Sequence, residues 1–592
     1  MGSYKDKNLY QRVMLRQSDM ESERDFLDQD SDRIIDCFRP DAIRFSDKKQ
    51  DVQKGILGAN IHEGTAPWAM RLMSDGMQGN LVSQSIVWLR YMLGQQKYKG
   101  NNAVNKWLQE FEEFMLSSYS DENSNFYEAM GPFTRHGITV GSPVVLPELD
   151  TESGRIIDIV PHPATRYLMQ NRFGITNGLN LKHKWTIRNA VATFGIENLS
   201  KSTQHAYEQG NDSDKITIVR GIYFYLDRIF KDFPNQRESK YVITEGDKEN
   251  TYSTFTPRWP WVSIYCEEDK TDDKTVEKKP LKIEGYFSKP FAIWHYEKDQ
   301  TEVYSRTPAH FSFYDVKSAN AVRKSIMMAG QKSVESAWWA PDYLKGKFKS
   351  YPRGINWYTA AQAQLKPEQL YEKINYPFGF EIEDRFCSSV KRHFHTEMWE
   401  MLSVWSREQK APPTATQIIQ MAGEKAVLLG PRVGPFMKTL HEVDARHVDI
   451  EDRRGNLPEP SDEVMEALQE SNGKIRPEFV GPLYRAQKLY LATRSVESAL
   501  ASIAPILEIY PMAKHKIKAD HLVEYLLEEG NFPQDLINDE DEYNEIVSAI
   551  VQQQMQQQMV EMGVNVAKAV PSVSKTVEPG SPIAGLLEGT AA

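Results

Sequence analysis

The chain has 592 residues, 40% of them hydrophobic and 26% charged, with a formal net charge of −11. This composition is that of a globular protein with enough apolar residues for several cores. Proteins that grip DNA without regard to sequence are normally basic, so the charge argues against an obligate DNA binder. It leaves two alternatives: a protein with no nucleic-acid contact, or one that lets DNA slide past.

The first half of the chain alternates between helical and strand patterns. Residues 1–60 are charge-rich and predict one or two helices and a loop. Apolar residues recur at helical spacing over 67–120, and another helix is expected to open near Phe126. Residues 140–300 are predicted to be mainly strands, with one helix near 184–209. Within them, Val144 to Leu146 and Arg155 to Val160 predict the two arms of a hairpin.

Two long helices separated by an insert are predicted after Pro308. The first covers 309–336, and the second begins at Phe378. The insert, 337–377, is rich in proline, glycine and aromatic residues and carries a basic run. That run, Lys345 to Arg353, has two interpretations that the residues do not separate. It could be a docking surface for acidic partners or DNA phosphate, or a solvated edge strand protected by lysines.

The second long helix carries an apolar residue at every fourth position. Four residues turn a helix by 400°, so the stripe winds by about 40° per step. Such a stripe suits a helix that crosses its neighbours at an angle, as in a tilted ring. An ordinary core, in which adjacent apolar positions straighten the face, is equally compatible with the spacing. The stripe comprises Phe378, Ile382, Phe386, Val390, Phe394, Met398 and Leu402.

A short polar loop, Ser406 to Lys410, follows the second helix. Pro412-Pro413 should end the helical pattern there, because proline lacks the N–H and restricts the residue before it. Thr414 or Thr416 can then cap a new helix. This third pattern covers 416–447 and is predicted to break at Gly430-Pro431. Further helices are expected at 477–508, 516–530 and 541–567, before a disordered tail.

A search for catalytic and metal-binding motifs indicates no enzyme. The sequence contains no G-x-x-x-x-G-K-[ST], G-x-S-x-G, H-E-x-x-H or C-x-x-C. His393 and His395 diverge by about 200° on a helix and cannot share an ion. The carboxylates of Glu381, Glu383 and Asp384 are best explained as a solvated helix start. We therefore expect no catalytic residue, metal or cofactor.

Three further patterns bear on the compartment. Cys37, Cys266 and Cys387 are far apart, which predicts free thiols in a reducing cytosol. No apolar run reaches the length of a membrane span, so no membrane partner is expected. The polar start of the chain predicts no secretion signal.

Several short sequence motifs occur in the same order as in the head-to-tail connecting (portal) proteins of short-tailed bacteriophages. The chain resembles that family over roughly 40–560. The Tyr304 start lacks the family's usual glycine, and Gln417 stands where the family often has Glu. Neither position is catalytic. The motifs are Ser124-Asn125-Phe126-Tyr127, Gly137 to Gly141, Gly285-Tyr286-Phe287, Pro290 to Trp294, Tyr304 to Ala309, Asp315 to Asn320, Thr414 to Gln417, Leu429-Gly430-Pro431, Gly455 to Pro458 and Pro482 to Gln487.

The resemblance implies an α+β, portal-type protomer with a β-rich wing, two long stem helices, an inserted clip and a helical crown. The implied parts are the wing at 1–306, stem helix 1 at 307–336, the clip at 337–377, stem helix 2 at 378–403, the channel (tunnel) loop at 404–415, a wing helix and return at 416–470, the crown or barrel at 471–567 and a disordered tail at 568–592.

The implied function is a ring at one capsid vertex, usually of twelve copies, that forms the channel for DNA packaging and ejection. Implied partners are the terminase large subunit, tail adaptor or nozzle proteins, the major capsid and scaffolding proteins, and double-stranded DNA bound without sequence preference. The protein would be part of the virion and would assemble in the host cytoplasm. The implied site residues are Arg407, Glu408, Gln409 and Lys410 in the channel loop; Lys345, Lys347, Lys349 and Arg353 on the clip; and Ile382, Phe386, Val390, Phe394 and Met398 in stem packing.

Two other functions compete with this one. A different ring protein of the phage neck, such as a tail adaptor, would generally be a much shorter chain without the clip. An α+β enzyme with unrecognised residues would run in solution as a monomer to tetramer, whereas a portal would run near ring mass.

Overall fold

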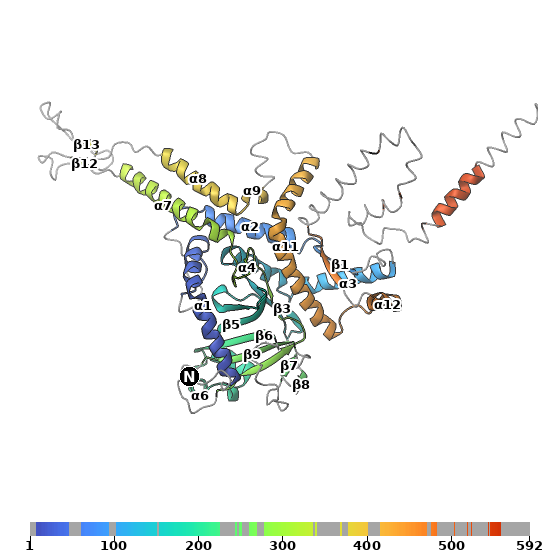
Figure 1. Ribbon diagram of the computed structural model, residues 1–592, viewed down its shortest axis with the longest axis horizontal. Helices are drawn as coiled ribbons and strands as arrows, with labels where there is room; N and C mark the ends of the chain where they lie inside the picture. Colours follow the sequence, from blue (N-terminus) through green and yellow to red (C-terminus); the bar gives the residue numbers. More distant parts are fainter. Residues whose placement is uncertain are drawn as a thin grey trace, which may run out of the picture.

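The computed structural model describes residues 8–46, 61–93, 102–150, 153–224, 260–268, 278–334, 377–400, 415–470 and 475–481, together with a helix over 545–557 and a few short pieces. In these residues the fold is α+β, as the sequence predicts. Figure 1 shows a body of strands and helices with one long pair of helices leaving it at the side.

The largest sheet lies in the body and has seven strands in the order β4-β5-β6-β9-β10-β7-β8. Its neighbours are antiparallel except for β10 and β7, which are parallel. The strands are β4 (Arg166–Gln170), β5 (Thr176–Thr186), β6 (Lys215–Phe224), β7 (Ile243–Glu245), β8 (Lys248–Asn250), β9 (Trp261–Glu267) and β10 (Lys282–Tyr286).

Helices cover this sheet. Helix α1 (Leu9–Phe38) packs Val13 against β6 and β9, in a cluster with Val219 and Val262. Between β5 and β6 the chain forms two helices, α5 (Ile187–Phe194) and α6 (Lys201–Glu208), separated by the short helix η4 (Ile196–Asn198). The single helix predicted near 184–209 is therefore wrong, because Gly195 takes a positive φ of 76° and ends α5.

A smaller sheet has the order β11-β2-β3 and joins the body to the helices. Strands β2 (Val144–Asp150) and β3 (Arg155–Ile159) pair antiparallel, which confirms the predicted hairpin. Strand β11 (Ala292–Ile293) pairs with the start of β2. The short helix η3 (Pro163–Thr165) then leads into β4.

The main hydrophobic core lies among helices. It is built from α2 (Thr65–Leu81), α3 (Asn102–Ser120) and α4 (Phe126–Thr139), with fully buried side chains such as Met73, Phe111 and Phe133. The helical prediction over 67–120 is wrong at Leu89–Leu93, which form strand β1. Strand β1 pairs with β14 (Ile475–Phe479), whose last three residues fall at the start of the helix predicted over 477–508. Short apolar runs do not distinguish helix from strand, and here the partner strand lies far along the chain.

Helix α11 (Ala415–Arg454) is continuous, so the break predicted at Gly430-Pro431 is wrong. Both Pro431 and Pro435 lie inside it, and each removes one backbone hydrogen bond. Packing outweighs this cost, because one face is buried at helical spacing; it comprises Leu429, Val433, Phe436, Leu440 and Val443. In Figure 1 the two halves of α11 run in different directions, as expected for a proline-containing helix. Helix α12 (Asp462–Glu470) packs on α3.

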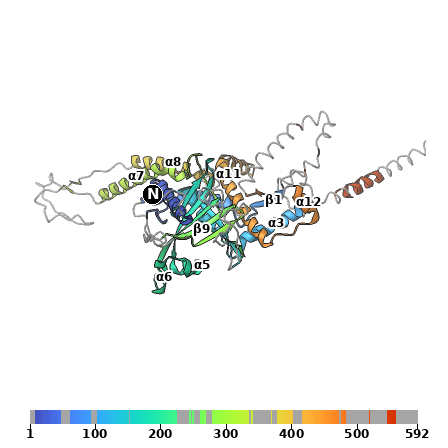
Figure 2. The ribbon, with the colours of Figure 1, turned by 60° about the horizontal axis from the view of Figure 1, so that its bottom comes forward.

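The helix pair that leaves the body consists of α7 (Pro308–Val334) and α8 (Pro377–His393). We call this pair the arm. Figures 1 and 2 both show the two helices side by side along the arm. A short antiparallel pairing of β12 (Trp338–Trp339) with β13 (Glu368–Gln369) brings the two ends of the insert together. Helix α9 (Thr396–Trp399) follows α8.

Candidate functional site: the arm and its root

Polar contacts hold the two helices of the arm in register. Arg323 of α7 forms an ion pair with Glu383 of α8 at 3.2 Å, and the Glu383 side chain is only 9% exposed. Nearer the body, the Ser389 hydroxyl donates to the Asp315 carboxylate at 2.6 Å. The sequence-based prediction that Glu383 belongs to a solvated helix start is therefore wrong. Partial burial strengthens its pairing with Arg323, because water screens the charges less.

Helix α7 is anchored where it leaves the body. The backbone N–H of Ser142 donates to the Ser305 hydroxyl at 2.9 Å, and the Ser305 N–H donates to the Ser142 hydroxyl at 2.8 Å. Gly141, at a φ of 90°, lies so close that an added Cβ would come within 2.5 Å of the Ser305 carbonyl oxygen. The Thr307 hydroxyl donates to the Thr139 carbonyl at 2.7 Å. Two of the sequence motifs given above, near 137–141 and 304–309, therefore contact each other where α7 leaves the body, and we call this contact the joint.

A half-buried histidine, His310, completes this joint. The ring nitrogen Nδ1 of His310 lies 2.7 Å from the Thr307 hydroxyl oxygen. Burial lowers the pKa of His310 to about 4. Its neutral form is therefore the native one at neutral pH.

The C-terminal end of α8, next to the body, is fixed in the core of the same chain. Val390 and Phe394 are fully buried, and the Phe394 ring lies 5.6 Å from that of Phe38 on α1. The helix ends here because His395 adopts the left-handed conformation with a φ of 51°. The continuous helix predicted over 378–403 is wrong at this point. Trp399 of α9 then packs on Gly76 of α2, where a Cβ would collide with the indole ring.

The apolar stripe predicted along the second long helix is thus divided between two environments. Val390 and Phe394 belong to the core of the protomer, and Met398 packs against it. Ile382 and Phe386 are half-buried along the arm. Helix α8 packs on α7 and α2, so the stripe has partners within one chain.

The second half of α11 is tied to the body by a buried polar network. Asp444 accepts hydrogen bonds from the hydroxyls of Tyr91 at 2.5 Å and Tyr119 at 2.9 Å. One turn later, His447 Nε2 lies 3.1 Å from the Asp158 carboxylate, and both side chains are fully buried. Burial and the nearby Asp444 carboxylate raise the pKa of both phenols well above 10. These contacts join α11 to β1, α3 and β3.

Comparison with known proteins now identifies the family. The sequence model described as "Bacteriophage head to tail connecting protein" matches residues 11–537. The chain belongs to this family.

Two similar proteins cover most of the connector's length. The chain is 21% identical over 580 residues to the "Portal protein" of Salmonella phage epsilon15, covering 97% of this chain and 96% of that one. It is 22% identical over 504 residues to the "Probable portal protein" of Bordetella phage BPP-1, covering 82% and 81%.

The channel-loop and clip residues predicted for the connector lie outside the described residues. These are Arg407, Glu408, Gln409 and Lys410, and Lys345, Lys347, Lys349 and Arg353. The structure does give their attachment points. The loop joins α9 to the start of α11, and the clip insert joins the far ends of α7 and α8.

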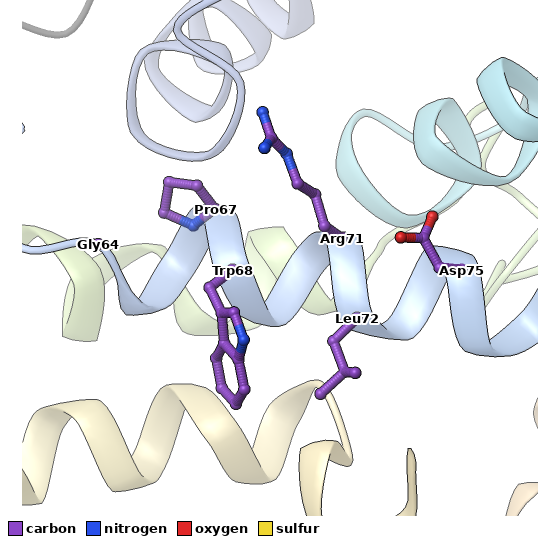
Figure 3. Close-up of a pocket in the computed structure, with 6 residues that line it drawn as sticks. All are labelled: Gly64, Pro67, Trp68, Arg71, Leu72 and Asp75. Carbon is purple, nitrogen blue, oxygen red and sulfur yellow. The ribbon is translucent and has the colours of Figure 1, made fainter. Parts of the chain in front are cut away.

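A shallow pocket of about 440 Å³ lies along α2 of the connector, near α8. It is lined by Gly64, Pro67, Trp68, Arg71, Leu72 and Asp75. Figure 3 shows Trp68 and Leu72 on one side of α2 and Arg71 on the other. The Lys391 ammonium of α8 lies 5.8 Å from the Trp68 ring. This contact lies between α8 and α2, and the lining offers no nucleophile paired with a base.

Neither a metal site nor a membrane span appears in the parts of the connector that the structure describes. No group of three or more His, Cys, Asp or Glu side chains there could hold a metal ion. No described helix combines the length and apolar character of a membrane span.

One feature of the site was missed from the sequence. Helix α7 has a second face, directed away from α8, on which Tyr314, Ala321 and Met328 are exposed. The signal was available, because these residues follow one another at seven-residue intervals, which keeps them on one side of a helix.

Proposed function

We propose that this connector forms a closed ring at one vertex of the capsid, through which double-stranded DNA is packaged and ejected. The observation that carries the proposal is the exposed outer face of α7. Tyr314 is 76% exposed and Met328 is 49% exposed on a helix whose other face is already packed. An exposed apolar stripe on a projecting helix is typical of a surface that another protein covers. In a family of ring proteins, that protein is another copy.

The parts of the chain then take the roles expected from the family. The body to residue 306 with 416–470 would be the wing, the arm the stem, 337–377 the clip, 404–415 the channel loop and 471–567 the crown. Ile382 and Phe386 would contribute to stem packing between copies. The names of the similar proteins from phages epsilon15 and BPP-1 support a portal role for this chain.

The role proposed is mechanical rather than catalytic. With a net charge of −11, the chain would offer DNA few phosphate-binding contacts, so the duplex could slide. Arg407 and Lys410 would touch the DNA backbone without arresting it. The terminase large subunit would supply the driving force while docked on the clip, and tail adaptor or nozzle proteins would replace it there. Capsid and scaffolding proteins would surround the ring, which would assemble in the host cytoplasm and remain in the virion.

An end-on electron micrograph of the purified protein tests this proposal. We expect closed rings, twelve copies being the expected number, with a central opening that admits duplex DNA. Light scattering should give the matching mass. A stable monomer at all salt concentrations would exclude the proposed function. A ring of a tail-adaptor type would be distinguished by failing to bind terminase.

A further inference from the structure

The arm has two outer faces, one on each helix, that point in opposite directions. On α7, the exposed residues opposite the α8 contact are Tyr314, Lys317, Ala321, Lys324 and Met328. Residues three and four apart share one side of a helix, so these five form a continuous stripe. The stripe is basic and apolar.

The outer face of α8 has the opposite charge over its first half. Glu381, Asp384 and Ser388 are exposed and point away from α7, and Lys391 follows on the same side near the body. Within the described residues, no ion pair is formed by Glu381 or Asp384. Phe380, at the outer end of the arm, is 44% exposed.

The contacts inside the arm fix which residues of the two helices lie at the same level. Arg323 pairs with Glu383 at 3.2 Å, and Asp315 accepts from Ser389 at 2.6 Å. The helices are antiparallel, so a step forward along α7 corresponds to a step back along α8. Both helices rise by about 1.5 Å per residue, so this correspondence holds along the whole arm.

Applied to the outer faces, this correspondence brings complementary residues to the same level. Lys324 lies level with Glu381, one turn away from Asp384. Tyr314 lies level with Lys391. The two faces of one arm cannot meet each other, because they point in opposite directions.

We propose that the outer face of α7 in one copy packs against the outer face of α8 in the next copy, with Lys324 opposite Glu381 as the selecting charge pair. The inference rests on the proposed ring and names the surface that closes it. Cyclic symmetry about an axis along the arm moves each residue to the same level in the next copy, so level residues meet. Ala321, between Tyr314 and Lys324 on the stripe, leaves room for the helices to approach.

The body end of this interface is a sandwich of one cation between two aromatic rings. Lys391 already lies 5.8 Å from Trp68 of its own copy, and Tyr314 of the next copy would approach it from the open side. A lysine ammonium near an aromatic face is attracted by the ring. The heterologous contact thus uses different residues on each copy, as a ring requires.

Charge reversal tests the pairing. Lys324→Glu and Glu381→Lys should each raise the subunit concentration needed for ring assembly by about three- to tenfold, since exposed pairs are individually modest. An equimolar mixture of the two variants should assemble nearly as well as the wild type, because each variant's altered face then meets an opposite charge. The matched control is Lys201→Glu on α6, which should assemble normally. Assembly is read by light scattering and electron microscopy.

The outcomes separate this inference from the proposed function. If the wild type forms rings and the single variants assemble equally well, or the mixture shows no rescue, the pairing is wrong while the ring stands. If the wild type forms no ring, the proposed function itself fails.

A second measurement does not depend on how the charged variants fold. In a Cys387→Ala background, the double variant Lys324→Cys and Glu381→Cys should form disulfide-linked ladders under mild oxidation of assembled rings. Rings that remain free of cross-links would overturn the proposed register.

Discussion

The buried carboxylate of Asp444 gives a sharp test of how α11 is held to the body. The perturbation is Tyr119→Phe, which deletes one hydroxyl and keeps the ring. That ring lies 4.4 Å from Phe126 and 4.9 Å from His447, so its packing should survive. Losing a hydrogen bond to a buried charged group costs about 1.5–3 kcal/mol. We expect the free energy of unfolding to fall by that amount at pH 8.

The pH dependence separates this cause from a loss of packing. Burial raises the pKa of Asp444 above its usual 3.8, while the two tyrosine donors lower it. Removing one donor should raise the folded-state pKa further. A carboxyl group whose pKa is raised by folding binds a proton more readily in the folded state. Its unfavourable contribution to stability is therefore relieved as the pH falls through that pKa toward 3.8. The variant should lose less stability at pH 5 than at pH 8.

The measurement is urea unfolding followed by tryptophan fluorescence, comparing midpoints at unchanged slope. Tyr207→Phe, at an exposed position on α6, is the control and should change stability by less than about 0.5 kcal/mol. In an Asp444→Asn background the same Tyr119→Phe change should cost only about 0.5–1.5 kcal/mol, as for a neutral hydrogen bond. An equal loss at both pH values and in both backgrounds would refute the reasoning.

Three further outcomes are expected. Replacing Lys345, Lys347 and Lys349 by Glu should leave the rings intact, since exposed charges affect association more than folding. It should weaken the binding of terminase or tail adaptor in a pull-down with purified rings. Unchanged binding, packaging and tail joining would contradict the docking role. Deleting 407–410 should permit ring formation yet reduce the DNA retained in filled heads, measured by genome quantification, and normal retention would contradict the channel-loop assignment. The pKa of His310 is lowered from 6.5 to about 4, so the unfolded chain binds a proton more readily than the folded one. The free energy of unfolding should therefore fall as the pH drops below 6.5, by about 2 kcal/mol at pH 5. His310→Asn should weaken this dependence of stability on pH in thermal melts.

Elements fixed by local chemistry were predictable from the sequence. The β2–β3 hairpin follows from two β-rich runs on either side of a turn that begins at Asp150 and ends at Gly154, and the structure gives Gly154 a φ of 67°. Helix α7 starts at Pro308, where proline's fixed φ and missing N–H are tolerated.

Elements decided by distant packing were not predictable. Strand β1 reads as helix because Leu89 and Met92 are three apart, and only its pairing with β14 makes it a strand. Helix α11 passes through Pro431 because its buried face outweighs the lost hydrogen bonds. His395 ends α8 with no local sequence signal of a left-handed residue.

The predicted site was reached only in part, for a similar reason. The apolar stripe of α8 gave the right helix, but spacing alone could not separate Val390 and Phe394, which face the protomer core, from Ile382 and Phe386 along the arm. The level correspondence between Lys324 and Glu381 required the internal contacts of the arm.

The pairing of β1 with β14 has a consequence for biosynthesis. Leu89 lies opposite Phe479, and the Trp88 ring stacks on that of Phe479 at 6.2 Å with an interplanar angle of 3°. A ribosome must therefore translate both helices of the arm, the insert and α11 before the early core receives its last strand. Contacts so distant in sequence form slowly, because a long loop must close first. Nascent chains would consequently leave the face of Trp88 that stacks on Phe479 uncovered until late in translation.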